Sequence, residues 1–137
     1  FFITTKTWGG AFSNFGESRN HHGELVSNNF NYNTLGMSID NAISHLEFKK
    51  PNYIKMDVDG IEHLILKGAK NLLKNNNLKE LSIEINPSYS EQYEFVNNIM
   101  LENNFKKVQS TNARILKNKD YKLNPNEIVN IIFKRND

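Results

Sequence analysis

The sequence predicts an α/β fold in which a parallel sheet alternates with helices and ends in an antiparallel pair of strands. Two β-rich apolar runs, at 53–58 and 80–85, read as interior parallel strands covered by helices, and a stretch with helical spacing separates them. Two further strand-like segments, at 105–109 and 127–135, end the chain with no helical pattern between them. Strands joined through a helix run parallel and strands joined by a loop alone run antiparallel, so this order predicts a mixed sheet.

Residues 1–50 lack helical periodicity over most of their length. Glycine and asparagine interrupt their apolar runs, which indicates short strands or extended loops. A short helix is expected after Ser38, because the apolar residues that follow have helical spacing and either Ser38 or Asp40 can serve as the N-cap.

One helix is predicted from Glu62 to Lys74, between the two central strands. Asp59 is its expected N-cap, Gly60 permits a tight turn, and Glu62 stands in the first turn, where the helix dipole favours a negative charge. The next helix is expected to begin at Ser90. The apolar faces of the two helices consist of Ile61, Leu64, Ile65, Ala69, Leu72 and Leu73, and of Tyr93, Val96, Ile99, Met100 and Leu101.

The composition restricts the classes of function. With 137 residues, 38% of them apolar, the chain is long enough for one domain with its own core. The 17 basic and 15 acidic residues are scattered, which argues against a nucleic-acid binder. The absence of cysteine excludes a disulfide framework and a thiolate zinc site. No apolar run approaches the roughly 20 residues of a membrane span and no leader opens the chain, so we expect a soluble, cytoplasmic protein.

Asp57 and Asp59 stand at the carboxyl end of the first central strand, where open α/β sheets bind their ligands. The two carboxylates are either functional groups or the polar end of a strand and the cap of the next helix, and the local pattern leaves both open. A strand that ends in DxDG also resembles the nucleophile motif of haloacid-dehalogenase-like phosphatases. Ile61 replaces the Thr or Val of that motif, and no later acidic pair follows. The DxD motif of metal-dependent glycosyltransferases is a similarly short match.

The other polar candidates are less specific. His21, His22 and His45 show no metal-ligand spacing on one element, so they are predicted to be solvated and no metal site is predicted. Lys55 and Arg19 are expected on the surface, although either can meet an anionic ligand.

A longer stretch resembles the FkbM-family methyltransferases, which are class I S-adenosylmethionine enzymes. The family pattern is a "tLD" segment, a strand "IKiDvEGxE", a helix "vLkGa..lL" and a strand that ends in Glu. The segments TLGMSIDNAI, PNYIKMDVDGIEHLILKGAKNLL and KELSIEIN follow that pattern over roughly 50 residues. Asp59 stands where the family usually has Glu. The matching residues are Ser38 to Asp40, Asp57, Asp59, Gly60, Glu62, Leu66 to Ala69, and Glu84.

The resemblance implies an incomplete Rossmann-like class I methyltransferase fold, consisting of the later strands and helices with a terminal antiparallel strand pair. Residues 1–137 would then be a single domain that is the C-terminal part of a methyltransferase domain. The glycine-rich strand-turn-helix that holds the cofactor in class I enzymes is not found, because the WGG at 8–10 follows no buried strand and opens no helix. We therefore expect those elements to precede Phe1 in a longer reading frame.

The activity that the resemblance implies is O-methyl transfer from S-adenosylmethionine to a hydroxyl of a sugar or natural product. Asp57 is then the first candidate for cofactor contact, for positioning and for proton acceptance. Asp59 and Glu62 are its electrostatic neighbours, and His63 is a possible base. The alternative is a non-catalytic fragment or interaction module of the same fold. A homodimer is expected, since half of a doubly wound sheet leaves an apolar edge uncovered.

Overall fold

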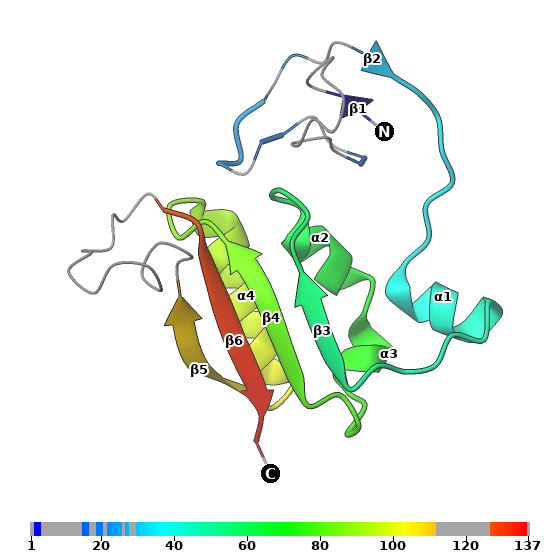
Figure 1. Ribbon diagram of the computed structural model, residues 1–137, viewed down its shortest axis with the longest axis vertical. Coiled ribbons are helices and arrows are strands. Elements are labelled where there is room, and N and C mark those ends of the chain that lie inside the picture. The colour runs from blue at the N-terminus through cyan, green and yellow to red at the C-terminus, as the bar shows by residue number, and fades with distance from the viewer. Residues whose placement is uncertain are drawn as a thin grey trace.

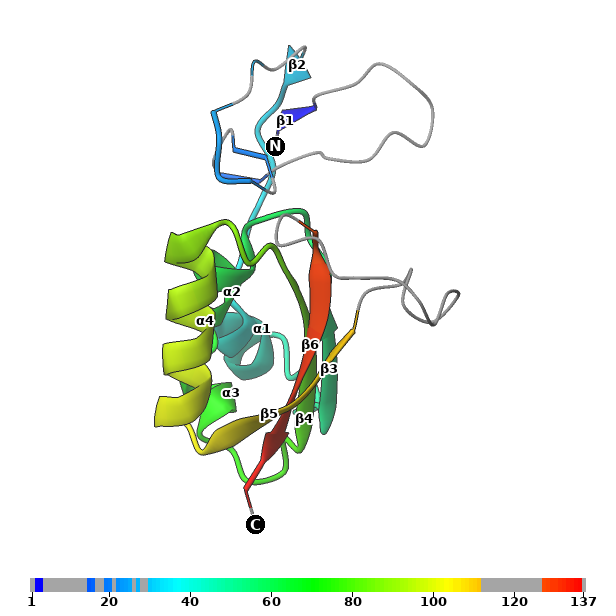
Figure 2. The ribbon, with the colours of Figure 1, turned by 90° about the vertical axis from the view of Figure 1, so that its left-hand side faces the viewer.

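The fold is a two-layer arrangement in which a sheet is covered by helices on one face (Figures 1 and 2). The computed structural model describes residues 2–3, 15–16, 19–20, 22–25, 27, 30–111 and 127–136. The elements follow in the order β1 (Phe2–Ile3), β2 (Phe30–Asn31), α1 (Ile39–His45), β3 (Tyr53–Met56), α2 (Glu62–Lys67), α3 (Lys70–Leu73), β4 (Glu80–Ile85), α4 (Ser90–Glu102), β5 (Phe105–Thr111) and β6 (Val129–Arg135).

The main sheet has the strand order β3-β4-β6-β5. Strands β3 and β4 are parallel neighbours, with Tyr53 opposite Glu80, which confirms the predicted pairing of the two central runs. The last two strands form the expected antiparallel pair. The final strand β6 lies between β4 and β5 and runs antiparallel to both, so it is an interior strand of the sheet.

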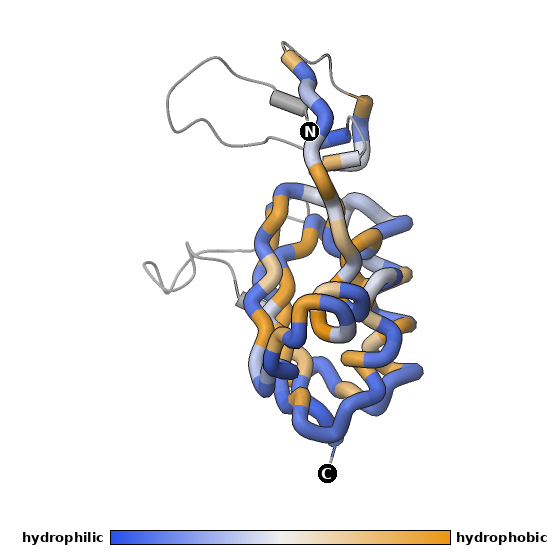
Figure 3. The backbone as a smooth tube through the Cα atoms, turned by 90° about the vertical axis from the view of Figure 1, so that its right-hand side faces the viewer, coloured by the Kyte–Doolittle hydropathy of each residue, from blue (hydrophilic) through white to orange (hydrophobic). Residues whose placement is uncertain are grey.

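The two faces of the sheet differ in polarity. Along β4, Leu81, Ile83 and Ile85 are buried, whereas the residues between them are only half-buried. Figure 2 shows the helices α1, α2, α3 and α4 on one side of the sheet, and Figure 3 shows hydrophobic and hydrophilic residues alternating along the strands. The prediction that both central runs are interior strands is confirmed for β4, which lies between β3 and β6, and is wrong for β3, which is at the edge of the described sheet with Tyr53 69% exposed.

The core lies between the helices and the inner face of the sheet. Each strand contributes every second residue, because side chains alternate across a pleated strand. The buried core consists of Met56, Leu66, Ala69, Leu72, Leu73, Leu78, Leu81, Ile83, Ile85, Val96, Met100, Phe105, Val129, Ile131 and Phe133.

The single helix predicted from Glu62 to Lys74 is wrong, because α2 ends at Lys67 and α3 begins at Lys70. The start of α1 docks at this break. A Cβ atom on Gly68 would lie 2.8 Å from Ser38 Cβ, so a side chain at position 68 would push α1 away. The Asp40 N–H also donates to the Gly68 carbonyl over 3.0 Å.

Ser38 and Asp40 have separate capping roles. Ser38 caps α1 as expected, since its hydroxyl accepts from the Asn41 N–H at 3.2 Å. The Asp40 carboxylate caps α3, because its two oxygens accept from the N–H groups of Asn71 at 2.9 Å and Leu72 at 3.0 Å. Asp40 therefore joins two helices that are thirty residues apart in sequence.

Arg135 ties the end of β6 to the helix ends around it. Its guanidinium lies 4.2 Å from the centre of the Phe105 ring. It also donates hydrogen bonds to four carbonyl oxygens, which satisfies groups that helix ends leave without an intrahelical partner. Those carbonyls belong to Leu73, Asn75, Leu78 and Asn103.

The short strands β1 and β2 pair antiparallel outside the main sheet, beyond the carboxyl ends of β3 and β4 in Figures 1 and 2. This agrees with the expectation of short strands and loops in the first fifty residues. The WGG segment, His21 and the loop at 112–126 lie outside the described residues. In the part of the chain that the structure describes, no helix has the length and apolar character needed to cross a membrane.

We predict that Asp40→Ala lowers the free energy of unfolding by about 1–2 kcal/mol, because two backbone N–H groups of α3 lose their acceptor. Asp40→Asn should lose less, since one side-chain oxygen remains. Urea unfolding of the chain measures both. Asn41→Ala, an exposed change in the same helix, is the control. Equal stability of Asp40→Ala and this control would contradict the capping role.

Candidate functional site

The carboxylates gather at the carboxyl ends of β3 and β4, the edge at which open α/β sheets bind ligands. Asp57 follows β3 directly, and Glu84 is the second-last residue of β4. The two strands are parallel and in register, so these side chains lie next to each other on the same outer face, and each carboxyl group shifts the pKa of the other.

Lys55 positions the Asp57 side of this pair. Its Nζ lies 3.0 Å from Asp57 Oδ2 and also donates to Asn130 Oδ1 on β6. Strands β3, β4 and β6 therefore each contribute to one polar cluster, which consists of Lys55, Asp57, Glu84 and Asn130. Lys55 is on the surface, as the sequence predicts.

The two carboxyl groups have opposite electrostatic surroundings. The hydrogen bond from Lys55 lowers the pKa of Asp57, and its hydrogen bond with Glu84 acts in the same direction. Burial raises the pKa of Glu84 to about 7, and the hydrogen bond and charge of Asp57 add to this effect. Asp57 is therefore the more acidic group of the pair, and Glu84 titrates near neutral pH.

Glu62 holds the loop between β3 and α2. Its side chain is 1% exposed, and burial raises its pKa. Oε1 accepts from the N–H groups of Val58 at 3.1 Å and Gly60 at 3.4 Å. Oε2 accepts from Gln92 Nε2 at 2.6 Å, which attaches the loop to α4. Glu62 is in the first turn of its helix, as predicted, with its carboxylate directed back to this loop.

The predicted capping role of Asp59 is wrong. The N-cap position belongs to Ile61, and no side chain caps α2 there. The Glu62 carboxylate takes up the loop amides instead. Asp59 and Gly60 have φ angles of 57° and 113°, so both lie in the left-handed region that makes the sharp turn.

His63 is packed away from solvent between two aromatic rings of the α4 region. It is 3% exposed. Its ring centre lies 5.7 Å from that of Tyr89 and 6.4 Å from that of Phe95, both edge-on. The predicted base is therefore part of the packing between α2 and α4.

Asn86 and Gln92, which follow β4 in the sequence, extend the site and were not predicted as site residues. The Asn86 side chain is buried, and the backbone N–H of Asn86 donates to Gln92 Oε1 at 3.4 Å. Asn86 Nδ2 donates to His22 Nδ1 at 2.7 Å, so the N-terminal segment reaches the carboxyl edge. His22 is exposed, as expected for a solvated histidine. Among the described residues, no group of three or more His, Asp or Glu side chains is arranged to hold a metal ion.

Two hollows flank the loop at 60–62. The first lies between Asp59, Glu84 and Gln92 and encloses about 10 Å³, which is room for about one water molecule. The second, of about 510 Å³, is lined mainly by apolar side chains, among them Met37 and Ile61. Its volume falls within the range of roughly 300–1,000 Å³ that is usual for small-molecule sites.

The chain matches the methyltransferase FkbM domain over residues 3–107. It belongs to the FkbM methyltransferase family. The match extends on both sides of the segments that carry the sequence resemblance, and it indicates that the protein is a methyltransferase. No curated protein and no solved structure matches the chain.

The motif residues of this FkbM domain divide into two groups. Asp57 and Glu84 are polar groups at the surface of the carboxyl edge, whereas Glu62 and Gly68 hold elements together. Glu84 was part of the sequence pattern but was not predicted as a site residue. The alternation in KELSIEIN places it on the same face as Asp57 once the parallel register is known, and that register was the missing signal.

We predict that the melting temperature of the chain falls as pH rises from about 5 to about 8.5. The folded pKa of Glu84 is raised from 4.5 to about 7, so the native state binds more protons than the unfolded chain in this window and loses stability as the proton leaves. The lowered pKa of Asp57 acts only at more acid pH.

Glu84→Gln tests this assignment, because Gln keeps a donor for Asp57 at every pH. The difference in melting temperature between Glu84→Gln and the unmodified chain should shift by roughly 2–5 °C in favour of the variant between the two pH values. Glu62 also has a raised pKa, but it is present in both proteins, so its effect on the pH dependence of the melting temperature cancels in the difference between them. A pH-independent difference would rule out the raised pKa of Glu84.

Proposed function

We propose that this FkbM domain takes part in O-methylation of a small-molecule hydroxyl, such as one on a sugar or natural product, with S-adenosylmethionine as the methyl donor. The observation that carries the proposal is the juxtaposition of Asp57 and Glu84 at the carboxyl ends of two parallel strands in register, where burial and the neighbouring carboxylate raise the pKa of Glu84 to about 7. A general base is most effective when its pKa is near the working pH.

The chemistry assigns separate roles to the two carboxylates. When bound, S-adenosylmethionine supplies an electrophilic methyl group on a sulfonium. Ionised Glu84 would accept the proton that the acceptor hydroxyl loses on methylation. Asp57, held by Lys55 over 3.0 Å, orients the hydroxyl or the cofactor and keeps the pKa of Glu84 high.

The described residues fit part of the cofactor. A carboxylate at a strand end accepts hydrogen bonds from ammonium and hydroxyl groups, which suits Asp57. The apolar hollow of about 510 Å³ on the other side of the loop at 60–62 suits a flat ring.

The Rossmann-like class I fold is part of the same proposal. The parallel pair β3–β4 with α2 and α3 between its strands supports it. The reversed strand β6 supports the expected terminal antiparallel pair. Under this proposal the chain is the C-terminal part of the domain and works in the cytoplasm.

The alternative is a non-catalytic fragment or interaction module, and cofactor binding distinguishes the two. Calorimetric titration of the chain with S-adenosylmethionine should give heat of binding if the carboxyl edge holds part of the cofactor. The FkbM assignment favours methyl transfer over the phosphatase and glycosyltransferase alternatives.

In the complete reading frame that contains this chain, we predict that Asp57→Asn and Glu84→Gln each reduce methyl transfer by roughly 100-fold, the usual scale for loss of a positioned proton acceptor. Asp59→Asn should have little effect, because Asn readily adopts the left-handed conformation that Asp59 has here. Turnover with radiolabelled donor measures all three. Equal, small reductions in turnover for all three variants would show that Asp57 is only the polar end of a strand.

We also propose that the chain forms a homodimer through the outer edge of β3. In the described part of the chain β3 pairs only with β4, and an open strand edge favours pairing with another chain. The outer face of the sheet is polar, so the edge is a better candidate for the dimer interface than the face.

Sedimentation velocity should show a dimer at high concentration. Tyr53→Pro places a residue without an N–H in this edge and should shift the chain to monomer. A monomer at all concentrations would contradict the dimer.

A further inference from the structure

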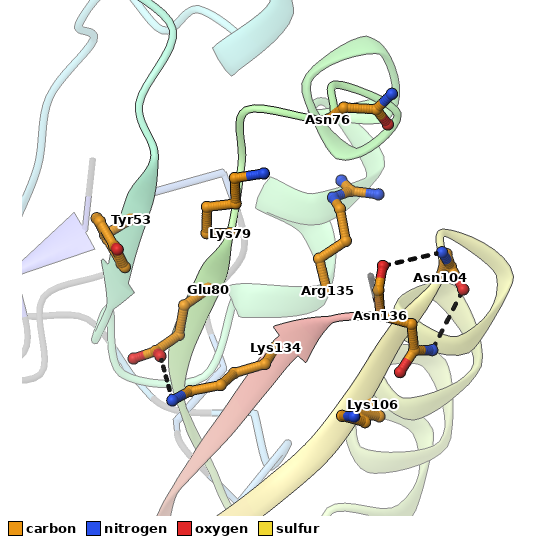
Figure 4. A pocket seen from close by; sticks show the side chains of 9 residues that line it. All are labelled: Tyr53, Asn76, Lys79, Glu80, Asn104, Lys106, Lys134, Arg135 and Asn136. Atoms are coloured by element: carbon orange, nitrogen blue, oxygen red, sulfur yellow. Dashed lines mark hydrogen bonds and ion pairs between the residues drawn. The ribbon is translucent and has the colours of Figure 1, made fainter.

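The most spacious hollow described in the chain lies at the opposite end of the sheet from the carboxylates. It encloses about 560 Å³ at the amino ends of β3 and β4 (Figure 4). We call it the amino-end cleft. Its volume is in the range of small-molecule sites, and Figure 3 shows that the end of the molecule next to the C-terminus is strongly hydrophilic.

The amino-end cleft is positively charged. Lys79, Lys106, Lys134 and Arg135 line it, and Glu80 is the sole acid among the described residues of its wall. Glu80 Oε2 lies 3.3 Å from Lys134 Nζ, so this carboxylate neutralises one of the four cations. The charge that remains is concentrated in one concave surface.

The sheet register brings two of these cations together. Lys106 on β5 is directly opposite Lys134 on β6, and both side chains lie on the outer face. Adjacent strands are about 4.8 Å apart, and like charges directly opposite each other destabilise a sheet. An anion bound between the two ammonium groups would remove this repulsion.

Arg135 forms a rigid end of the cleft. Its guanidinium rests on Phe105 and donates four hydrogen bonds to neutral carbonyl oxygens, so its orientation is set, and no carboxylate among the described residues forms an ion pair with it. Figure 4 shows Arg135 and Lys79 on one side of the cleft and Lys134 and Lys106 on the other. Positive groups therefore face the hollow from two sides.

We propose that the amino-end cleft binds a multiply charged phosphate group. A compact anion with several oxygen acceptors matches ammonium donors that converge from two sides. Two sources of this group are possible, a free polyphosphate or a nucleotide. The ring of Tyr53 is in the same cross-strand row as Glu80, Lys134 and Lys106, and it offers an exposed aromatic surface on which the base of a nucleotide can stack.

The test is calorimetric titration of the chain with inorganic pyrophosphate at low ionic strength. The double variant Lys79→Gln, Lys106→Gln should bind at least about tenfold more weakly than the unmodified chain, because two charge-assisted contacts are lost. The control is Lys70→Gln, Lys107→Gln, which changes the net charge equally. Lys107 is next to Lys106 but on the helix side of the sheet, with its Nζ 5.8 Å from the centre of the Tyr93 ring.

Titration with ADP identifies the source. If Tyr53→Ala weakens ADP binding and leaves pyrophosphate binding unchanged, the cleft takes a nucleotide; if it changes neither, the cleft takes the phosphate group alone. Thermal unfolding confirms that each variant is folded. The proposal is overturned if the unmodified chain binds neither compound, or if the control loses as much affinity as the cleft variant. None of these measurements depends on methyl transfer.

Discussion

The buried Glu62 carboxylate is the constraint on which the carboxyl edge depends. A buried charge is costly unless hydrogen bonds surround it, and here the loop amides of Val58 and Gly60 and the amide of Gln92 supply them. These bonds hold the left-handed turn at 59–60 and attach the end of β3 to α4. Asp57 occupies its place beside Glu84 because this turn carries the chain away from the sheet directly after it.

The same sheet carries opposite charge at its two ends. The carboxyl ends of β3 and β4 bear Asp57 and Glu84, and the amino ends bear Lys79 with Lys106 and Lys134 from the neighbouring strands. The separation is possible because the described helices lie on the other side of the sheet, so the side chains of its outer face are partly or fully exposed to solvent. Electrostatic attraction would therefore direct cationic or hydroxyl groups to one end and anions to the other.

Hydrogen bonds between distant residues hold the helix layer in place. The helices α2 and α3 are short, and helices of this length are not stable alone. Asp40 caps α3 from the start of α1, and Arg135 binds the carbonyls at the end of α3 from the last strand. Gly68 leaves the space in which Ser38 fits. Several residues of the FkbM pattern are thus explained by packing and capping alone.

The sequence by itself determined the α/β class, the parallel pairing of the runs at 53–58 and 80–85, the antiparallel final pair and the FkbM family. These follow from local periodicity and from residues at fixed spacing, which a linear chain displays directly. The predictions of an Asp59 cap and of one continuous helix over α2 and α3 were wrong. Helix propensity does not include the packing of Ser38 against Gly68 or the hydrogen bonds from the loop amides to the Glu62 carboxylate.

Only the tertiary structure decided which polar residues act together. Glu84 joins Asp57, Lys106 faces Lys134, and β6 lies inside the sheet, because strand order and register bring together residues that are far apart in the chain. The raised pKa of Glu84 has the same origin. It arises from burial and from a neighbouring carboxylate on another strand, and neither exists until the sheet has formed.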